Sequence, residues 1–349
     1  MEGIENITSL VTEGADVDEL INDDIISDEI TDIVMKLLMY IFTPVIAFFG
    51  IIGNTLSIII LVKNGIHKSS NILLISLAFC NTVYLIAYNS IPKVLYIATG
   101  HLSYDGFSEY DTYLLFIFFS VFTFLDYSFG LMALSVPMLI TIERLIVIFF
   151  PLSCHRIVTP ERTWLVLGTV ILYWSSIFVY TSFWLDIEYI WDAHLNKSIG
   201  HFENSDMIAG NLEAVVAVET LFGYTSMVIP PLFTALGCIV ISIKLKIASI
   251  KRKALSANSS FSQKTTKILL AVCFLYVITS AYASLALFKP EYAWYTLADK
   301  PPTNVALIVS QVSNIIGCIN SSSDFVVYIV MNKNFRVNLT ELFRRRLKN

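Results

Sequence analysis

Residues 113–150 decide the fold of this chain, and they read YLLFIFFSVFTFLDYSFGLMALSVPMLITIERLIVIFF. The charged side chains in this stretch are those of Asp126, Glu143 and Arg144. A helix needs about 20 apolar residues to cross the hydrocarbon core of a bilayer, and this run is long enough. In lipid, every backbone amide must find its hydrogen-bond partner within its own segment. The stretch therefore predicts a membrane-spanning helix.

Six further apolar runs are long enough to span a bilayer, and they lie at residues 34–62, 70–98, 163–185, 214–245, 266–288 and 304–331. Charged residues make up 15% of the chain, whereas soluble domains have about 25%. The sequence predicts an all-α membrane protein, a seven-transmembrane helix bundle with a short amphipathic eighth helix. Its expected parts are an acidic, disordered extracellular tail (1–33), the bundle (34–331), and an amphipathic helix with a cytoplasmic tail (332–349).

The basic residues predict the orientation of these spans. If the N-terminus is outside, 18 of the 23 Lys and Arg residues lie on the inner side. Membrane insertion favours this distribution and disfavours its inverse. We therefore expect a multi-pass protein of the plasma membrane with an extracellular N-terminus. The five basic residues left on the outer side are Lys36, Lys93, Lys197, Lys289 and Lys300.

Two sequons agree with this orientation. Asn6-Ile7-Thr8 and Asn196-Lys197-Ser198 both match the N-glycosylation acceptor pattern, and both fall on the predicted outer side. We expect Asn6 and Asn196 to be glycosylated.

Short polar motifs recur at set positions in four spans. They are Gly53-Asn54 in the first, Leu77-Ala78-Phe79-Cys80-Asn81 in the second, Glu143-Arg144-Leu145 in the third and Asp324-Phe325-Val326-Val327-Tyr328 in the seventh. In order and spacing they resemble the G-N, L-A-x-x-D, E/D-R-Y and N/D-P-x-x-Y motifs of rhodopsin-like (family 1) G-protein-coupled receptors. The resemblance covers about residues 34–345.

The resemblance implies a receptor and not an enzyme, with no cofactor and no metal. Such a receptor binds an extracellular ligand, which is a peptide, an amine or a chemosensory small molecule, and it activates a heterotrimeric G protein. Membrane lipid is the other expected partner, and nucleic acid is not one. The resemblance places coupling and switching at Glu143, Arg144, Asn54, Asn81, Asp324 and Tyr328.

Departures from the family pattern point to a divergent branch. Phe119 stands where the family has an outer cysteine, and Thr279-Ser280-Ala281-Tyr282 stands where it has C-W-x-P. Asn81 and Ala133 also remove a charge and a hydroxyl from the usual sodium pocket. The chain resembles expanded invertebrate chemosensory or FMRFamide-like peptide receptors. Because the seventh span contains no Lys, it cannot form a Schiff base with retinal.

Asp126 is the candidate ligand-binding residue. It precedes Arg144 by five helical turns of 3.6 residues, so the two side chains share one face of the helix. An acid within a spanning segment is costly and normally faces the bundle interior or water. Asp126 therefore either holds a cationic ligand or bonds a neighbouring polar group. Tyr127 and Gly130 could complete an aromatic, partly open site, although packing is the simpler explanation for Tyr127.

Two other classes of protein are alternatives to a signalling receptor. A transporter or ion channel would also span the membrane several times, but the sequence has no inverted repeat and no pair of broken helices at matching positions. A seven-helix protein that does not signal is the other alternative, because the sixth-span motif is lost.

Overall fold

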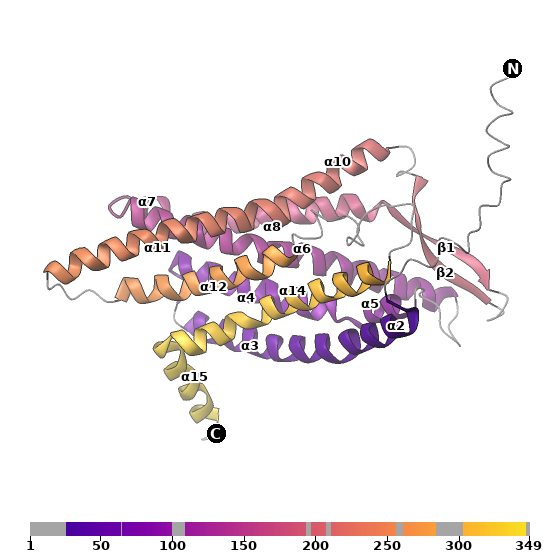
Figure 1. Cartoon of the computed structure of the whole chain (residues 1–349), viewed down its shortest axis with the longest axis horizontal. Helices are drawn as coiled ribbons and strands as arrows, with labels where there is room; N and C mark the ends of the chain where they lie inside the picture. Colours follow the sequence, from indigo (N-terminus) through magenta and orange to yellow (C-terminus); the bar gives the residue numbers. More distant parts are fainter. Residues whose placement is uncertain are drawn as a thin grey trace, which may run out of the picture.

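The computed structural model describes residues 26–346, apart from residues 64, 100–108, 193–196, 207–210, 256–260 and 284–302. The predicted glycosylation sites Asn6 and Asn196, most of the predicted tail and the end of the predicted sixth span lie outside the described residues. In Figure 1 the long helices run side by side along the longest axis of the molecule.

The predicted spans are helical. In chain order the helices are α2 (Asp28–Leu37), the π-helix η1 (Leu38–Phe42), α3 (Thr43–Lys63), α4 (Ser69–Tyr88), α5 (Ile91–Thr99), α6 (Glu109–Phe149), α7 (Cys154–Ile157), α8 (Pro160–Ser182), α10 (Leu212–Gly223), the π-helix η2 (Tyr224–Val228), α11 (Ile229–Leu255), α12 (Phe261–Ala283), α14 (Asn304–Met331) and α15 (Lys333–Arg346). Within the described residues, six helical segments are long and apolar enough to cross a membrane, and α12 contains a shorter apolar helix, Ile268–Tyr282. The prediction of a seven-helix membrane bundle is confirmed.

The first helix starts earlier than predicted. α2 begins at Asp28, so residues 28–33 are helical although the sequence predicted them as the end of a disordered tail. The Asn304 amide, at the start of α14, donates to Asp28 Oδ1 over 2.6 Å and to the Ile26 carbonyl over 3.0 Å. These bonds hold the first turn against α14, and no hydrophobic pattern in the sequence reveals them.

The predicted second span, 70–98, consists of two helices. α4 ends at Tyr88 and α5 restarts at Ile91, directly before Pro92. Proline has no amide hydrogen and disfavours helical geometry in the residue before it, so a helix often ends there. A helix that restarts after such a break need not keep the register of the preceding helix. As a result, the inward-facing positions of α5 could not be counted from those of α4.

Pro230 and Pro231 of the fifth span lie within continuous helix. The π-helix η2 ends at Val228, and α11 continues through both prolines from Ile229. A single π turn changes the hydrogen-bond pattern of the turn just before them, and such turns are frequent at functional sites. The two prolines therefore leave the fifth span helical, with an altered hydrogen-bond pattern only in the turn before them.

A β-hairpin lies at one end of the bundle. β1 (Leu185–Asp192) pairs antiparallel with β2 (Lys197–Asn204), with Leu185 opposite Asn204 and Asp192 opposite Lys197. Figure 1 shows the hairpin at the same end as α2 and α5. All five cysteines of the chain are free thiols, so no disulfide ties this hairpin to α6.

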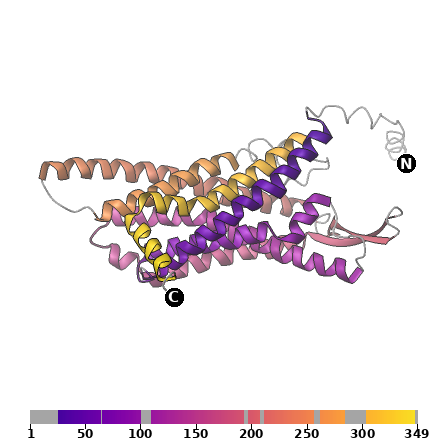
Figure 2. The same cartoon turned by 90° about the horizontal axis from the view of Figure 1, so that it is seen from below.

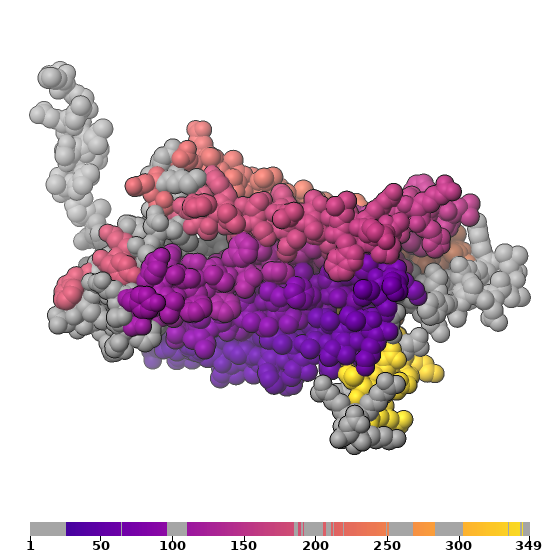
Figure 3. Space-filling view, turned by 180° about the vertical axis from the view of Figure 1, so that it is seen from behind, coloured from indigo at the N-terminus to yellow at the C-terminus, as the bar shows by residue number. Residues whose placement is uncertain are grey.

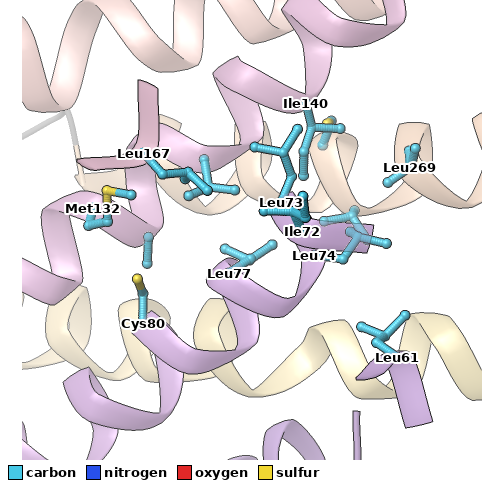
Figure 4. Close-up of a cluster of buried hydrophobic side chains, with 14 of the residues drawn as sticks. Leu61, Ile72, Leu73, Leu74, Leu77, Cys80, Met132, Ile140, Leu167 and Leu269 are labelled. Carbon is cyan, nitrogen blue, oxygen red and sulfur yellow. The ribbon is translucent and has the colours of Figure 1, made fainter. Parts of the chain in front are cut away.

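The core lies where α3, α4, α6, α8, α12 and α14 meet. Figure 4 shows Ile72 and Leu73 of α4 close to Ile140 of α6, and Leu77 of α4 and Leu269 of α12 belong to the same cluster. α3 and α14 lie side by side in both views (Figures 1 and 2). Gly53 of α3 permits this approach, since a Cβ atom there would lie 2.9 Å from the ring of Phe325 on α14.

α15 follows α14 after one non-helical residue and turns away from the bundle (Figure 3). Phe335 is buried, with its ring 5.6 Å from that of Tyr328 and 6.0 Å from that of Phe325. Arg336 donates to the carbonyls of Ile329 and Val330, which are among the last of α14. These contacts fix the direction of the predicted amphipathic helix.

Candidate functional site

The predicted polar residues fall into two groups at different depths of the bundle, with a third cluster between helices at the hairpin end. Nearly all of these polar side chains come from the helices α3, α4, α6 and α14, and Lys93 comes from α5.

Arg144 lies in a buried cluster at the end of α6 remote from the hairpin. Arg144 Nη2 lies 3.1 Å from Glu143 Oε2 and also donates to Ser70 Oγ on α4. Ser70 Oγ in turn donates to Glu143 Oε1 over 2.7 Å. Glu143 and Arg144 are both buried, so each charge depends on the other and on the Ser70 hydroxyl. The motif resemblance predicted Glu143 and Arg144 as coupling residues, but it did not predict the contact with Ser70.

Asn54, Asn81 and Asp324 join three helices. Asn81 Nδ2 donates to Asp324 Oδ2 over 3.0 Å, which links α4 to α14. Asn54 Nδ2 donates to the Ser321 carbonyl over 2.8 Å, which links α3 to α14. All three side chains are buried, and bonds of this kind hold helices together in lipid.

Tyr328 lies one turn beyond Asp324 on α14. It is buried, and its ring packs against Phe335. Within the described residues, its hydroxyl has no hydrogen-bond partner. Tyr328 therefore belongs to the packing between α14 and α15 in this state.

The stretch that replaces C-W-x-P contacts the seventh span through a hydrogen bond. Thr279 Oγ1, on α12, donates to Asn320 Oδ1 on α14 over 3.0 Å. α12 runs through this stretch as an uninterrupted helix, in keeping with its lack of proline. Neither Thr279 nor Asn320 was singled out from the sequence as part of a functional site.

Asp126 already has a cationic partner in this state. Lys93 Nζ forms an ion pair with Asp126 Oδ2, and the two side chains are 9% and 6% exposed. The count of basic residues on the two sides of the membrane placed Lys93 on the outer side, with four other basic residues. The sequence did not predict that its side chain is buried. The signal that could have found it is Pro92, because the helix break lets the following lysine face inward.

Aromatic rings surround this ion pair. Lys93 Nζ lies 5.3 Å from the centre of the Tyr88 ring and 5.0 Å from that of Tyr127. Tyr127 stacks on Phe178 of α8, with ring centres 4.9 Å apart. Tyr88 donates to Gln311 on α14 over 3.4 Å. Asp126 and Tyr127 therefore both contact the Lys93 ammonium, and a ligand-binding role for either residue stays a prediction.

Gly130 borders an aromatic ring and not open space. A Cβ atom on Gly130 would lie 2.9 Å from Tyr84 Cδ2, so the absence of a side chain lets α4 and α6 approach closely. A small cavity nearby is lined by Met39, Thr43, Tyr88, Asn89, Val94 and Gln311, and its room of about 10 Å³ is at the limit for one water. A ligand role for Gly130 stays a prediction that requires the bundle to open.

The fold defines the class of protein, a seven-helix bundle of the membrane. The sequence profile of the family described as "Serpentine type 7TM GPCR chemoreceptor Srw" matches residues 41–346, and the chain belongs to this family. The family is one of receptors, so the protein is a receptor and not an enzyme.

The chain is also similar to a curated receptor. It is 25% identical over 312 residues to a protein of Drosophila melanogaster named "FMRFamide receptor". The alignment covers 87% of this chain and 53% of the relative, so the chain spans about half the length of that protein. The expected resemblance to divergent invertebrate receptors is confirmed by both comparisons.

Proposed function

We propose that this chain is a plasma-membrane receptor that binds an extracellular peptide and activates a heterotrimeric G protein. The family match over residues 41–346 supports ligand binding and G-protein coupling in general. The similarity to a protein named for a peptide supports a peptide over an amine. That name spells the tetrapeptide amide Phe-Met-Arg-Phe-amide, which has a guanidinium and two aromatic rings.

The observation that carries the peptide proposal is the buried Lys93–Asp126 pair with its aromatic surroundings. A guanidinium suits Asp126, and phenyl rings suit the layer formed by Tyr88, Tyr127 and Phe178. At the other end of α6, the Ser70–Glu143–Arg144 cluster is the element whose state a G protein would read. The ligand shifts that state only by its differential affinity for the active arrangement.

The purified receptor in lipid nanodiscs, mixed with heterotrimeric G proteins, provides the test. Phe-Met-Arg-Phe-amide is expected to raise nucleotide exchange in proportion to its occupancy. The same peptide with citrulline in place of arginine should be much weaker, because citrulline removes the guanidinium charge that suits Asp126 and leaves the N-terminal amine unchanged. If a panel of peptide amides leaves exchange at the basal rate while small odorants raise it, the chemosensory alternative in the family's description replaces the peptide.

The orientation can be tested separately. An epitope at the N-terminus is expected to be stained on intact cells, and one after Asn349 only after permeabilisation. The physical reason is that 18 of the 23 basic residues then lie on the cytoplasmic side. Untagged receptor measures the background staining. The opposite staining pattern would remove the proposed receptor orientation at the plasma membrane.

A further inference from the structure

We propose that Cys238 and Cys273 are an oxidation site, at which a hydroperoxide forms a disulfide between α11 and α12. The bond prevents these two helices from separating and so acts as a reversible brake on the receptor. The oxidation site depends on the two thiols alone, whereas the brake rests on the proposed receptor function. The two parts are therefore tested by different measurements.

The two thiols come from neighbouring helices. α11 and α12 run side by side along the bundle (Figure 1). The Cys238 thiol is within hydrogen-bonding reach of the Cys273 thiol and of the Thr141 hydroxyl, and Cys238 packs against the core cluster to which Cys273 belongs. Both thiols are free in this state. A cysteine that senses oxidation often has a second cysteine beside it that completes a disulfide.

α6 holds the pair from a third side. Cys273 Sγ donates to the Pro137 carbonyl over 3.8 Å and lies 3.6 Å from Thr141 Oγ1. The Thr141 hydroxyl gives its own hydrogen to the Pro137 carbonyl over 2.8 Å, so its oxygen is left to accept from a thiol. Gly237 lets α11 come close to α6, since a Cβ atom there would collide with the methyl group of Thr141. Three helices therefore position the two sulfur atoms.

The two thiols differ in exposure, and the difference sets the order of reaction. Cys273 is 2% exposed, whereas Cys238 is partly exposed and precedes Ile239, which is 57% exposed. Oxidation of a thiol requires that the oxidant reach its sulfur atom, so a hydroperoxide reacts with Cys238 first. Cys273 then serves as the second thiol, which reacts only with its neighbour.

The reaction balances with one hydroperoxide for each disulfide. The Cys238 sulfur attacks the terminal oxygen of the hydroperoxide, the O–O bond breaks, an alcohol or water leaves, and Cys238 becomes a sulfenic acid. The Cys273 sulfur then attacks the Cys238 sulfur, and the S–O bond breaks as the S–S bond forms. The hydroxyl group leaves as water with the Cys273 proton. Two electrons and two protons thus pass from the thiols to the hydroperoxide.

The new bond would lie next to the cluster of Ser70, Glu143 and Arg144. Thr141 precedes Arg144 on α6 by about one helical turn. The geometry of a disulfide fixes the spacing of the two backbones that it joins, so α11 and α12 cannot move apart at this depth until the bond is reduced. Disulfides that form in contact with the cytosol are usually transient and sense the redox state.

Peptide mapping tests the disulfide without any signalling. The receptor in nanodiscs, with Cys154→Ser to remove the thiol of α7, is treated with hydrogen peroxide or with the lipid-soluble cumene hydroperoxide. A peptide that links Cys238 to Cys273 should appear, and dithiothreitol should remove it. Either oxidant supports the site if it forms this link. A faster reaction with cumene hydroperoxide assigns the supply of oxidant to the bilayer, and a faster one with hydrogen peroxide assigns it to the aqueous side.

The chain offers matched controls. A disulfide restricts the unfolded chain, so the oxidised receptor should melt at a higher temperature than the reduced receptor. Cys238→Ala and Cys273→Ala should each lose this difference. Cys80→Ala and Cys318→Ala remove other buried thiols, 3% and 0% exposed, and should keep it. Each comparison is between the oxidised and reduced forms of one variant, so a general loss of stability in that variant does not affect it.

The brake is measured by nucleotide exchange. Oxidation should lower the exchange that Phe-Met-Arg-Phe-amide stimulates by the same fraction as the fraction of receptor that carries the link, and dithiothreitol should restore it. In Cys238→Ala, the hydroperoxide should leave exchange unchanged.

Each result decides one part of the inference. If neither hydroperoxide links Cys238 to Cys273, or if Cys238 is oxidised to a sulfinic acid with no link, the inference fails, even where the peptide activates the reduced receptor. If the link forms and exchange is undiminished, the brake is wrong. If the link forms while no peptide raises exchange in the reduced receptor, the oxidation site stands and the proposed peptide function fails.

Discussion

Arg144→Ala is expected to abolish the rise in agonist affinity that a bound G protein produces. Coupling is reciprocal, so a G protein that responds to agonist must also tighten agonist binding, typically by about 5- to 150-fold. Arg144 is buried in the cluster with Glu143 and Ser70, at the end of α6 remote from Asp126. Agonist affinity without G protein should therefore change little. Competition binding with Phe-Met-Arg-Phe-amide, with and without G protein, measures both quantities.

Two variants separate the role of Arg144 from simple loss of positive charge. Arg162→Ala removes an exposed arginine, whose guanidinium donates to the Arg156 and Ile157 carbonyls, and it should leave the affinity shift intact. Ser70→Ala keeps the Glu143–Arg144 pair but removes both hydrogen bonds of the Ser70 hydroxyl, so its effect should be intermediate. An undiminished affinity shift in Arg144→Ala would mean that the resemblance of Glu143-Arg144-Leu145 to the coupling motif is accidental.

The helical spans could be predicted from the sequence because lipid leaves the backbone few options. An apolar run of spanning length must be a helix, and this holds for α6 and α14 whatever they pack against. The contact between Asn81 and Asp324 was also accessible, since the motif resemblance places both residues in one cluster. The helical spans follow from composition, and the residues of the polar cluster follow from the order of the motifs.

The polar contacts of Lys93 and Ser70 could not be predicted, because they depend on where a helix is interrupted and on how two helices cross. The position of Lys93 depends on the break before Pro92, and the charge count treats every lysine near a span end as solvent-facing. The register of Ser70 beside Glu143 is likewise a matter of how α4 and α6 cross. The hydrophobic pattern predicts which residues avoid water, but it does not predict which polar side chains form hydrogen bonds or ion pairs between helices.

Trp174→Ala is expected to destabilise the receptor by about 3–5 kcal/mol, the usual cost of truncating a buried tryptophan. Trp174 lies mid-helix in α8 and is 2% exposed. Its ring packs edge-on against Phe222, with centres 6.1 Å apart, and its indole Nε1 donates to Ser135 Oγ on α6 over 3.0 Å. The substitution removes both contacts and leaves a cavity between α6 and α8. Thermal unfolding of the purified receptor in detergent measures the loss.

The same helix provides the control. Trp164 of α8 is 50% exposed, so Trp164→Ala should change stability by about 0.5 kcal/mol or less. Trp174→Phe keeps most of the ring but removes the N–H donor, and its cost should be near the 0.5–1.5 kcal/mol that a single hydrogen bond typically contributes. Equal melting temperatures for Trp174→Ala and Trp164→Ala would show that Trp174 faces lipid and that α8 is rotated about its axis. The order Trp164→Ala, Trp174→Phe, Trp174→Ala, from mildest to most severe, follows only if the indole is buried against α6.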